Sequence, residues 1–86
     1  MTVIADPDKL RTLAKKLKSS GEQIEQMQRQ ALGALQASGW NDHERQRFEA
    51  DLSRDLKAAS AIGRKLQHDY PKALERKAKA LDDFRR

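Results

Sequence analysis

Hydrophobic residues recur at alternating intervals of three and four positions through the first half of this 86-residue chain. The positions that follow this spacing are Leu10, Leu13, Leu17, Ser20, Ile24, Met27, Ala31 and Ala34. Such a spacing aligns side chains along one side of an α-helix as a heptad seam. Asp6 and Pro7 are typical of a helix start, because the carboxylate caps the first turn and proline needs no hydrogen bond there. The pattern predicts a helix over residues 7–37.

The residues after this helix are typical of a tight turn. Gly39 suits the left-handed backbone position that ends many helices. Asn41 is followed three residues later by Glu44, which resembles the capping box at the start of a helix. We therefore expect a turn at residues 38–41.

A second apolar stripe follows the turn and predicts a helix over residues 42–69. Its members are Phe48, Leu52, Leu56, Ala59, Ile62, Leu66 and Tyr70. Pro71 is expected to kink or break this helix, because proline lacks an N–H donor and clashes with the preceding turn. Helical spacing resumes in a C-terminal tail over residues 72–85.

Two long helices joined by a short turn lie antiparallel. The sequence therefore predicts an all-α fold, in which residues 1–86 form a single domain, an antiparallel two-helix hairpin. If the chain folds back at Gly39 and Trp40, the numbers of facing residues add up to about 80. This register places Gly21 opposite the small residues 58–60, where the two backbones can approach closely.

A single contact between two helices leaves much of each apolar stripe exposed. We therefore expect two hairpins to dimerise into a four-helix bundle, as a homodimer or as a heterodimer with a paralogous hairpin. The residues expected at this interface are Leu10, Leu13, Leu17, Ile24, Met27, Leu52, Leu56, Ile62 and Leu66.

The C-terminal tail extends past the start of the first helix in this register and has no neighbour to cover its apolar side chains. We expect it to act as a mobile docking element. The residues expected to dock are Tyr70, Leu74, Leu81 and Phe84.

The composition narrows the function classes. Charged residues make up 36% of the chain, and cysteine is absent, which excludes disulfides and thiolate chemistry. His43 and His68 are far apart and have no metal-ligand spacing, and no glycine-rich phosphate loop is present. We expect no catalytic residues, no metal and no cofactor, hence no enzyme. No stretch is apolar enough to span a membrane, and no cleavable signal peptide is evident.

The tryptophan in the central turn gives the chain a resemblance to a known family. Trp40 lies near the middle of the chain and Phe48 follows eight residues later. A helical hairpin of this length with such a turn resembles the WXG100, or ESAT-6-like, family over essentially its whole length. The turn motif would comprise Gly39, Trp40, Asn41, Asp42 and Phe48, with Asp42 where the family's Trp-x-Gly motif has glycine.

The resemblance implies a non-enzymatic dimeric protein that acts through protein–protein interaction. It would be a secreted substrate, effector or adaptor of a type VII (ESX-like) secretion system, cytoplasmic before export without a cleaved signal peptide. A secretion ATPase would be a further partner. The family's export signal is Tyr-x-x-x-Asp/Glu; here Tyr70 lies in the corresponding region, but Leu74 occupies the acidic position and Glu75 comes one residue later.

The net charge of +5 suggests an alternative. Five cations fall within residues 9–18 and six more within residues 72–86, and an antiparallel fold brings the two groups to one end. A basic end of this kind can contact phosphates, so a small helical-hairpin dimer that binds nucleic acid is the second hypothesis. A self-assembling hairpin resembling type III secretion needles ranks below it, because the turn contains no proline.

Overall fold

The computed structural model describes residues 5–84, and the regular structure within them is entirely helical. In chain order the elements are α1 (Pro7–Ala37), α2 (His43–Arg64), a π-helical turn η1 (Lys65–Asp69) and α3 (Tyr70–Phe84). The all-α prediction is confirmed, and α1 has the predicted bounds. Because α2, η1 and α3 follow one another without a gap, we call them together the second arm.

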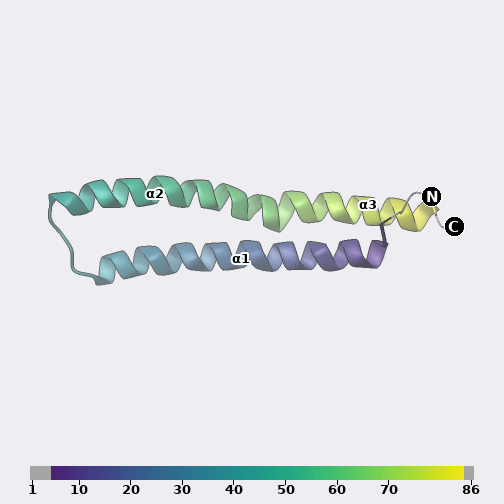
Figure 1. Cartoon of the computed structure of the whole chain (residues 1–86), viewed down its shortest axis with the longest axis horizontal. Helices are drawn as coiled ribbons and strands as arrows, with labels where there is room; N and C mark the ends of the chain where they lie inside the picture. Colours follow the sequence, from purple (N-terminus) through teal and green to yellow (C-terminus); the bar gives the residue numbers. More distant parts are fainter. Residues whose placement is uncertain (1–4, 85–86) are drawn as a thin grey trace.

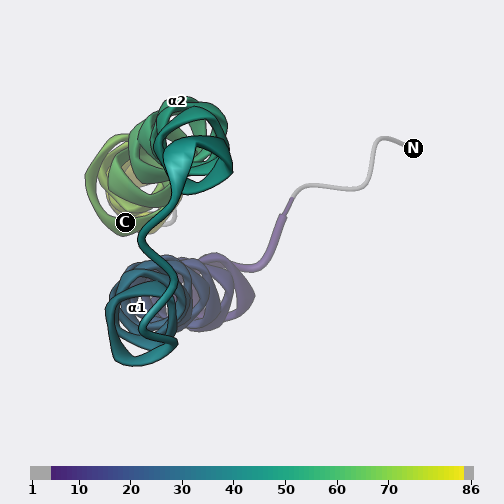
Figure 2. The same cartoon turned by 90° about the vertical axis from the view of Figure 1, so that its left-hand side faces the viewer.

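The two arms lie side by side in an elongated molecule that measures 65 × 19 × 17 Å. Figure 1 shows that the chain reverses direction between α1 and α2, so that α1 runs antiparallel to the whole second arm. The end-on view in Figure 2 shows only these two rods, with α3 offset sideways from α2. No third layer covers either side of the contact within residues 5–84.

Local capping chemistry sets the helix ends. The Asp6 carboxylate accepts a 2.9 Å hydrogen bond from the backbone N–H of Asp8, and Pro7 follows it. Gly39 has the expected left-handed backbone, with φ of +72°. The prediction of Asn41 as the cap of the second helix is wrong, because Asp42 takes that place and accepts from the N–H of Arg45.

The two arms approach each other closely because small residues occupy the contact between them. Ala14 and Ala78 are almost fully buried, and Gly21 and Gly63 are buried as well. A Cβ atom built on Gly21 would lie 2.8 Å from the carbonyl oxygen of Gly63. The close approach expected at Gly21 is therefore present, but its partners are Gly63 and Gln67 rather than residues 58–60.

The expected register, with facing residue numbers adding up to about 80, is therefore wrong. Already before the π-helical turn, the numbers of the facing pairs Gly21 with Gly63 and Gln28 with Leu56 add up to 84. The π-helical turn then adds a residue to the second arm, which moves the pairing further toward the C-terminus. Arg11 consequently contacts Asp82 and Glu75 of α3, whereas facing numbers that add up to about 80 would place it near residue 69.

Pro71 does not break the second arm. The helix remains continuous through Pro71, and the irregularity lies one turn earlier, where the N–H of Tyr70 donates to the carbonyl of Lys65 in a π-type bond. In a regular helix the proline ring clashes with the carbonyl four residues earlier. The wider π-turn before Pro71 relieves this clash. The turn also changes which side of α3 meets α1.

The expected exposure of the tail is likewise wrong. Pro71, Ala78 and Leu81 are buried and Leu74 is half-buried, because α3 packs along the first half of α1. The corrected register provides the neighbour that the sequence-based register lacked. Residue 85, the last of the predicted tail, lies outside the described residues.

Candidate functional site

The side of α1 that contacts the second arm follows a 3-4 spacing, but it is offset from the predicted seam. Its buried and half-buried members are Pro7, Leu10, Ala14, Leu17, Gly21, Ile24, Gln28, Ala31 and Leu35. The predicted seam shares Leu10, Leu17, Ile24 and Ala31 with this set. Its other members, Leu13, Ser20, Met27 and Ala34, each lie one position before a buried or half-buried residue, on an exposed part of the helix surface.

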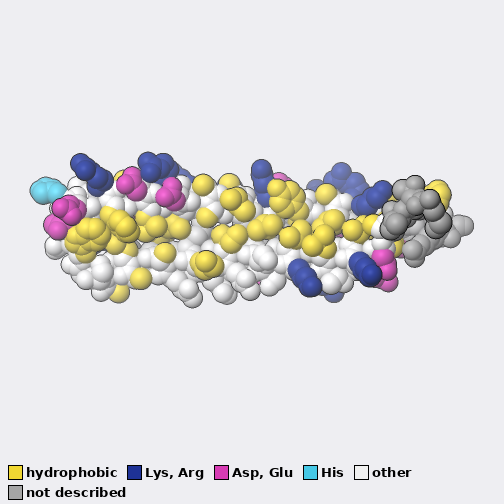
Figure 3. All heavy atoms as spheres, in the orientation of Figure 1, with side chains coloured by type: hydrophobic (Ala, Val, Ile, Leu, Met, Phe, Trp, Pro, Cys, Tyr) yellow, Lys and Arg dark blue, Asp and Glu magenta, His cyan; other side chains and the backbone are white. Residues whose placement is uncertain are grey.

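These offset positions create an apolar edge along the contact between the arms. Leu13 remains 43% exposed, Met27 63% and Ile62 54%. Near the middle of the molecule the edge is hollowed into a groove of about 310 Å³ between α1 and α2. The groove is lined by Ile24, Met27, Gln28, Ala31, Leu56, Ala59 and Ile62. Figure 3 shows hydrophobic side chains as a nearly continuous band along the length of the molecule.

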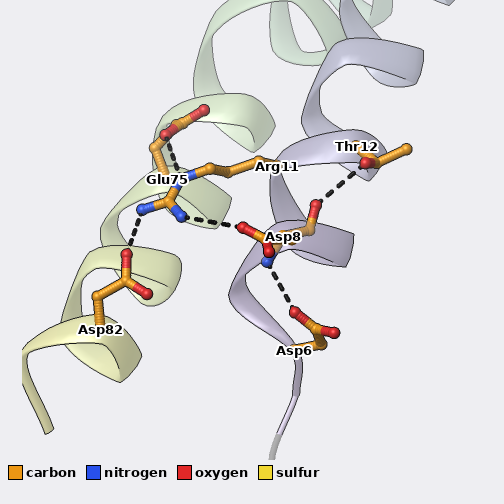
Figure 4. Close-up of polar contacts among 6 residues, drawn as sticks. All are labelled: Asp6, Asp8, Arg11, Thr12, Glu75 and Asp82. Atoms are coloured by element: carbon orange, nitrogen blue, oxygen red, sulfur yellow. Dashed lines mark hydrogen bonds and ion pairs between the residues drawn. The ribbon is translucent and has the colours of Figure 1, made fainter. Parts of the chain in front are cut away.

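Polar bridges cross the opposite edge of the contact, which is also hollowed beside Leu32 and Leu56 into a groove of about 360 Å³. Arg11 of α1 donates a 2.6 Å hydrogen bond to Asp82 of α3 and lies 3.7 Å from Glu75 (Figure 4). Gln67 donates a 2.9 Å hydrogen bond to Glu25 of α1. Arg11 and Glu25 each come one position after a contact residue of α1 (Leu10 and Ile24), whereas Leu13 and Met27 each come one position before one (Ala14 and Gln28). One step of about 100° in either direction places the two sets on opposite edges.

Arg11 joins three carboxylates at the end of the molecule where α1 begins. The hydrogen bond to Asp82 raises the pKa of the Arg11 guanidinium above its ordinary value. Burial lowers this pKa by a smaller amount, and the charges of Asp82, Glu75 and Asp8 each raise it by less still. Arginine is already charged at any physiological pH. Arg11 therefore stays charged and forms ion pairs between α1 and α3, rather than acting as a proton donor.

The residues of the predicted turn motif come together at the opposite end. The rings of Trp40 and Phe48 lie 5.4 Å apart between centroids. The indole N–H of Trp40 donates a 2.7 Å hydrogen bond to Asp42, and Arg45 donates to the carbonyl of Trp40. Asp42 thus receives the indole and caps α2, two tasks that a glycine side chain cannot perform. Asn41 is exposed and takes no part in this cluster.

The structure divides the residues that were expected at a dimer interface. Six of them are half-buried: Leu10, Leu17, Ile24, Leu52, Leu56 and Leu66. Leu13, Met27 and Ile62 project from the apolar edge. The tail residues divide similarly, since Leu74 and Leu81 are covered by α1, whereas Tyr70 is 47% and Phe84 82% exposed. Leu74 and Leu81 are therefore not available to dock a partner.

Charge is unevenly distributed along the molecule. We call residues 5–18 and 64–84 the open end; it holds eleven Lys and Arg against six Asp and Glu, a net charge of +5. Residues 19–63, the turn end, hold five Lys and Arg against seven Asp and Glu, a net charge of −2. On the face drawn in Figure 3, basic side chains border the hydrophobic band in the half that contains α3, and most acidic ones lie nearer the turn.

The second arm also carries two histidines and borders an open cavity. No group of three or more His, Asp or Glu among the described residues could hold a metal ion, and His43 and His68 lie on separate, exposed parts of the second arm. A cavity of about 560 Å³ beside η1 is open and carries both signs of charge, from Lys18, Glu22, Lys72 and Glu75. No helix among residues 5–84 is long and apolar enough to cross a membrane.

Comparison of the chain with models of protein families, with curated proteins and with solved structures finds no match to any of them. The apolar edge, the polar edge and the turn cluster therefore have to be interpreted from their own chemistry.

Sequence reasoning missed Gln67 and the small contact residues Ala14 and Ala78, and it did not recognise Gly63 as the partner of Gly21. Gly63 lies against Gly21 and Ile24, and Gln67 reaches across to Glu25. A signal was present, because Ala14 and Gly21 are small residues seven positions apart on α1. Small residues at heptad spacing indicate where two helices approach closely, and a second helical glycine is the natural partner of the first.

Proposed function

We propose that this protein is a non-enzymatic interaction module, which binds another helical hairpin along its apolar edge to form a four-helix bundle. The observation that carries the proposal is the row of exposed Leu13, Met27 and Ile62 beside an apolar groove. Helix pairs in bundles bury such a face against a second pair, and an exposed apolar strip of this length marks an interaction surface. The partner hairpin is a second copy or a paralogue.

A photo-reactive benzoylphenylalanine in place of Met27 tests this proposal in the cells that make the protein. The expected product is a cross-linked adduct of about twice the 9.8 kDa chain mass, the size of two hairpins. The matched control is the same substitution at Glu22, which is exposed and comes one position after Gly21, on the polar edge. Equal labelling at the two positions, or no adduct of this size at Met27, would overturn the proposal.

The resemblance to the WXG100 family extends the proposal to export by a type VII (ESX-like) secretion system, as a substrate, effector or adaptor. The packing of Trp40 on Phe48 at the turn between the arms supports it. We expect the chain in the medium of cells with an active secretion ATPase and only inside cells that lack it. An identical distribution in the two strains would refute export and leave the interaction module intact.

Nucleic-acid binding is the second candidate, and the net charge of +5 at the open end favours it. Lys15, Lys18, Lys72, Arg76 and Lys79 are exposed there and make no ion pair with any residue between 5 and 84. Phosphate contacts of this kind weaken steeply with salt. A gel shift at about 50 mM salt should show binding if the candidate is correct, and no retardation there would end it.

A further inference from the structure

Six exposed side chains form one stripe along the second arm. They are Phe48, Asp55, Ile62, Tyr70, Lys77 and Phe84. The first three follow one another at intervals of seven residues in α2, and the last three do so in α3. Seven residues make about two helical turns, so each triplet lies in line. Ile62 and Tyr70 are eight residues apart, and the wider π-turn between them takes up the additional residue.

The stripe is complementary to the same stripe on a second, antiparallel copy of the arm. Counted outward from Leu66, Ile62 and Tyr70 are equally distant, as are Asp55 and Lys77, and also Phe48 and Phe84. An antiparallel copy of the arm would thus set an aromatic residue against an aromatic residue, an acid against a base, and Ile62 against Tyr70. The nearest ionic partner of Asp55 among residues 5–84 is Arg54, at 3.9 Å, and the Asp55 side chain is 78% exposed.

The outward row on α1 has the same symmetry. Leu13, Ser20, Met27 and Ala34 are spaced at sevens, and their midpoint falls between Ser20 and Met27. This midpoint lies within about one helical turn of the level of Leu66, because Gly21 lies against Gln67. A single two-fold axis that crosses both arms can therefore relate both rows to their own copies.

The charges of the two ends agree with this orientation. Antiparallel copies place the open end of one molecule, with a net charge of +5, beside the turn end of the other, with a net charge of −2. Parallel copies bring the two strongly basic ends together, which like-charge repulsion disfavours. An axis along the arms would also lay α1 on the second arm of the other copy, so the self-complementary stripe would not meet itself.

We propose that the partner on the apolar edge is a second copy of this chain, bound face to face and antiparallel about a two-fold axis beside Leu66. In this dimer Asp55 of each copy contacts Lys77 of the other, Phe48 contacts Phe84, and Ile62 contacts Tyr70. The interface is isologous, as in most symmetric dimers. One face of a molecule that measures 65 × 19 Å provides more than the about 800 Å² that each partner contributes to a standard interface.

The inference rests on the proposed function, since it uses the same edge, and disulfide cross-linking tests it separately. The chain contains no cysteine, so Asp55→Cys and Lys77→Cys each introduce a single thiol. Under mild oxidation an equimolar mixture of the two variants should form a disulfide-linked dimer. Each variant alone should remain uncross-linked, because its thiol faces a lysine or an aspartate of the other copy.

Charge exchange supplies a second, equilibrium test. Asp55→Lys and Lys77→Asp should each weaken self-association on the order of tenfold in sedimentation equilibrium, because two symmetry-related contacts become repulsive. The double variant D55K/K77D should recover most of the loss. Glu22→Lys is the matched control, an exposed carboxylate beside the polar edge, and should leave self-association unchanged. Asp55, Lys77 and Glu22 are all exposed, and circular dichroism verifies that each variant keeps its helices.

The outcomes are distinct. Cross-linking of the mixture alone, together with recovery in the double variant, supports the antiparallel homodimer. A purified chain that stays monomeric, or Asp55→Cys chains that cross-link to each other, would overturn it. A monomeric chain whose Met27 still cross-links to a different hairpin in cells would refute the second copy while the proposed function stands.

Discussion

Gly21 and Gly63 set the distance between the two arms. A Cβ atom on Gly21 would meet the Gly63 carbonyl oxygen at 2.8 Å and the side chain of Gln67 at 2.5 Å, whereas one on Gly63 would meet its nearest neighbours at 3.6 Å. The close contact is therefore asymmetric, and only Gly21 requires the absence of a side chain. Neither glycine has a positive φ, so the requirement comes from packing and not from backbone conformation.

Replacement of Gly21 with alanine should lower the free energy of unfolding by about 1–3 kcal/mol, because overpacking pushes the arms apart. Urea denaturation followed by circular dichroism measures the change. Gly33→Ala is the matched control, since a Cβ there has no neighbour within 4 Å, and it should raise stability by about 0.5–1 kcal/mol through helix propensity. Equal stability of the two variants would show that the arms do not pack as described.

Trp40 holds the turn end together through its ring and its indole N–H. Trp40→Ala removes the packing on Phe48 and the hydrogen bond to Asp42. We expect a loss of about 2 kcal/mol, below the about 3–5 kcal/mol typical of fully buried aromatics, because Trp40 is only half-buried. Trp40→Phe retains a ring and should lose less. An unchanged melting temperature for Trp40→Ala would show that the turn does not depend on this side chain.

At the scale of the elements, η1 decides which side of α3 meets α1. In an uninterrupted helix, heptad spacing from Gly63 would direct Tyr70, Lys77 and Phe84 toward α1. The π-turn advances the contact by one residue, so Pro71 and Ala78 are buried and the other three are exposed. The turn thereby avoids burying a lysine and leaves two aromatic residues on the exposed stripe.

Changes of chain length within η1 test this role. Deletion of His68 combined with Pro71→Ala removes the extra residue and lets a regular helix form with α3 in the same rotational phase, so stability should be retained. Insertion of one alanine after His68 instead rotates α3 by about 100° and takes Ala78 and Leu81 out of the contact. Amide hydrogen exchange should then show loss of protection in α3 only. Equal protection in both variants would contradict this role of η1.

The helix ends could be predicted from the sequence, because capping depends on neighbouring residues. Asp6 with Pro7, and Gly39, are local signals, and the structure confirms both. The pairing of the arms could not be predicted from the apolar pattern. Leu10, Leu17, Ile24 and Ala31 fit two seams, one through Leu13 and Met27 and one through Ala14 and Gly21, and hydrophobicity favours the first. Close approach of the backbones selects the second, which is a tertiary effect.

The same ambiguity limited the prediction of the candidate site. The stripe of large apolar residues was recognised from its spacing, but its members proved to be partly inside the chain's own contact and partly on its apolar edge. The π-turn, which no local pattern before Pro71 specifies, further separated Leu74 and Leu81 from Tyr70 and Phe84. The turn cluster was better predicted, because Trp40, Asp42 and Phe48 are close in sequence.

The apolar residues of the whole molecule fall into two groups, those buried within the single chain and those that only a partner would bury. Leu81 is 9% exposed and stabilises the single chain, whereas Met27 is 63% exposed and gains burial only when a partner covers it. If a second copy covers the apolar edge, the folded state is stabilised by mass action. The melting temperature of the wild-type chain should therefore rise with protein concentration, whereas that of a protein stable as a monomer should stay constant.

Leu81→Ala and Met27→Asp should separate these two groups. Leu81→Ala removes a buried contact between α3 and α1 and should cost about 2–4 kcal/mol at every concentration, with the concentration dependence of the melting temperature preserved. Met27→Asp should leave the melting temperature of the dilute protein nearly unchanged, since the side chain is exposed in the single chain, and should abolish the rise with concentration. Calorimetry over about a hundredfold range of concentration measures both effects. A melting temperature of Met27→Asp that rises as steeply as the wild type would mean that the chain associates through a surface other than its apolar edge.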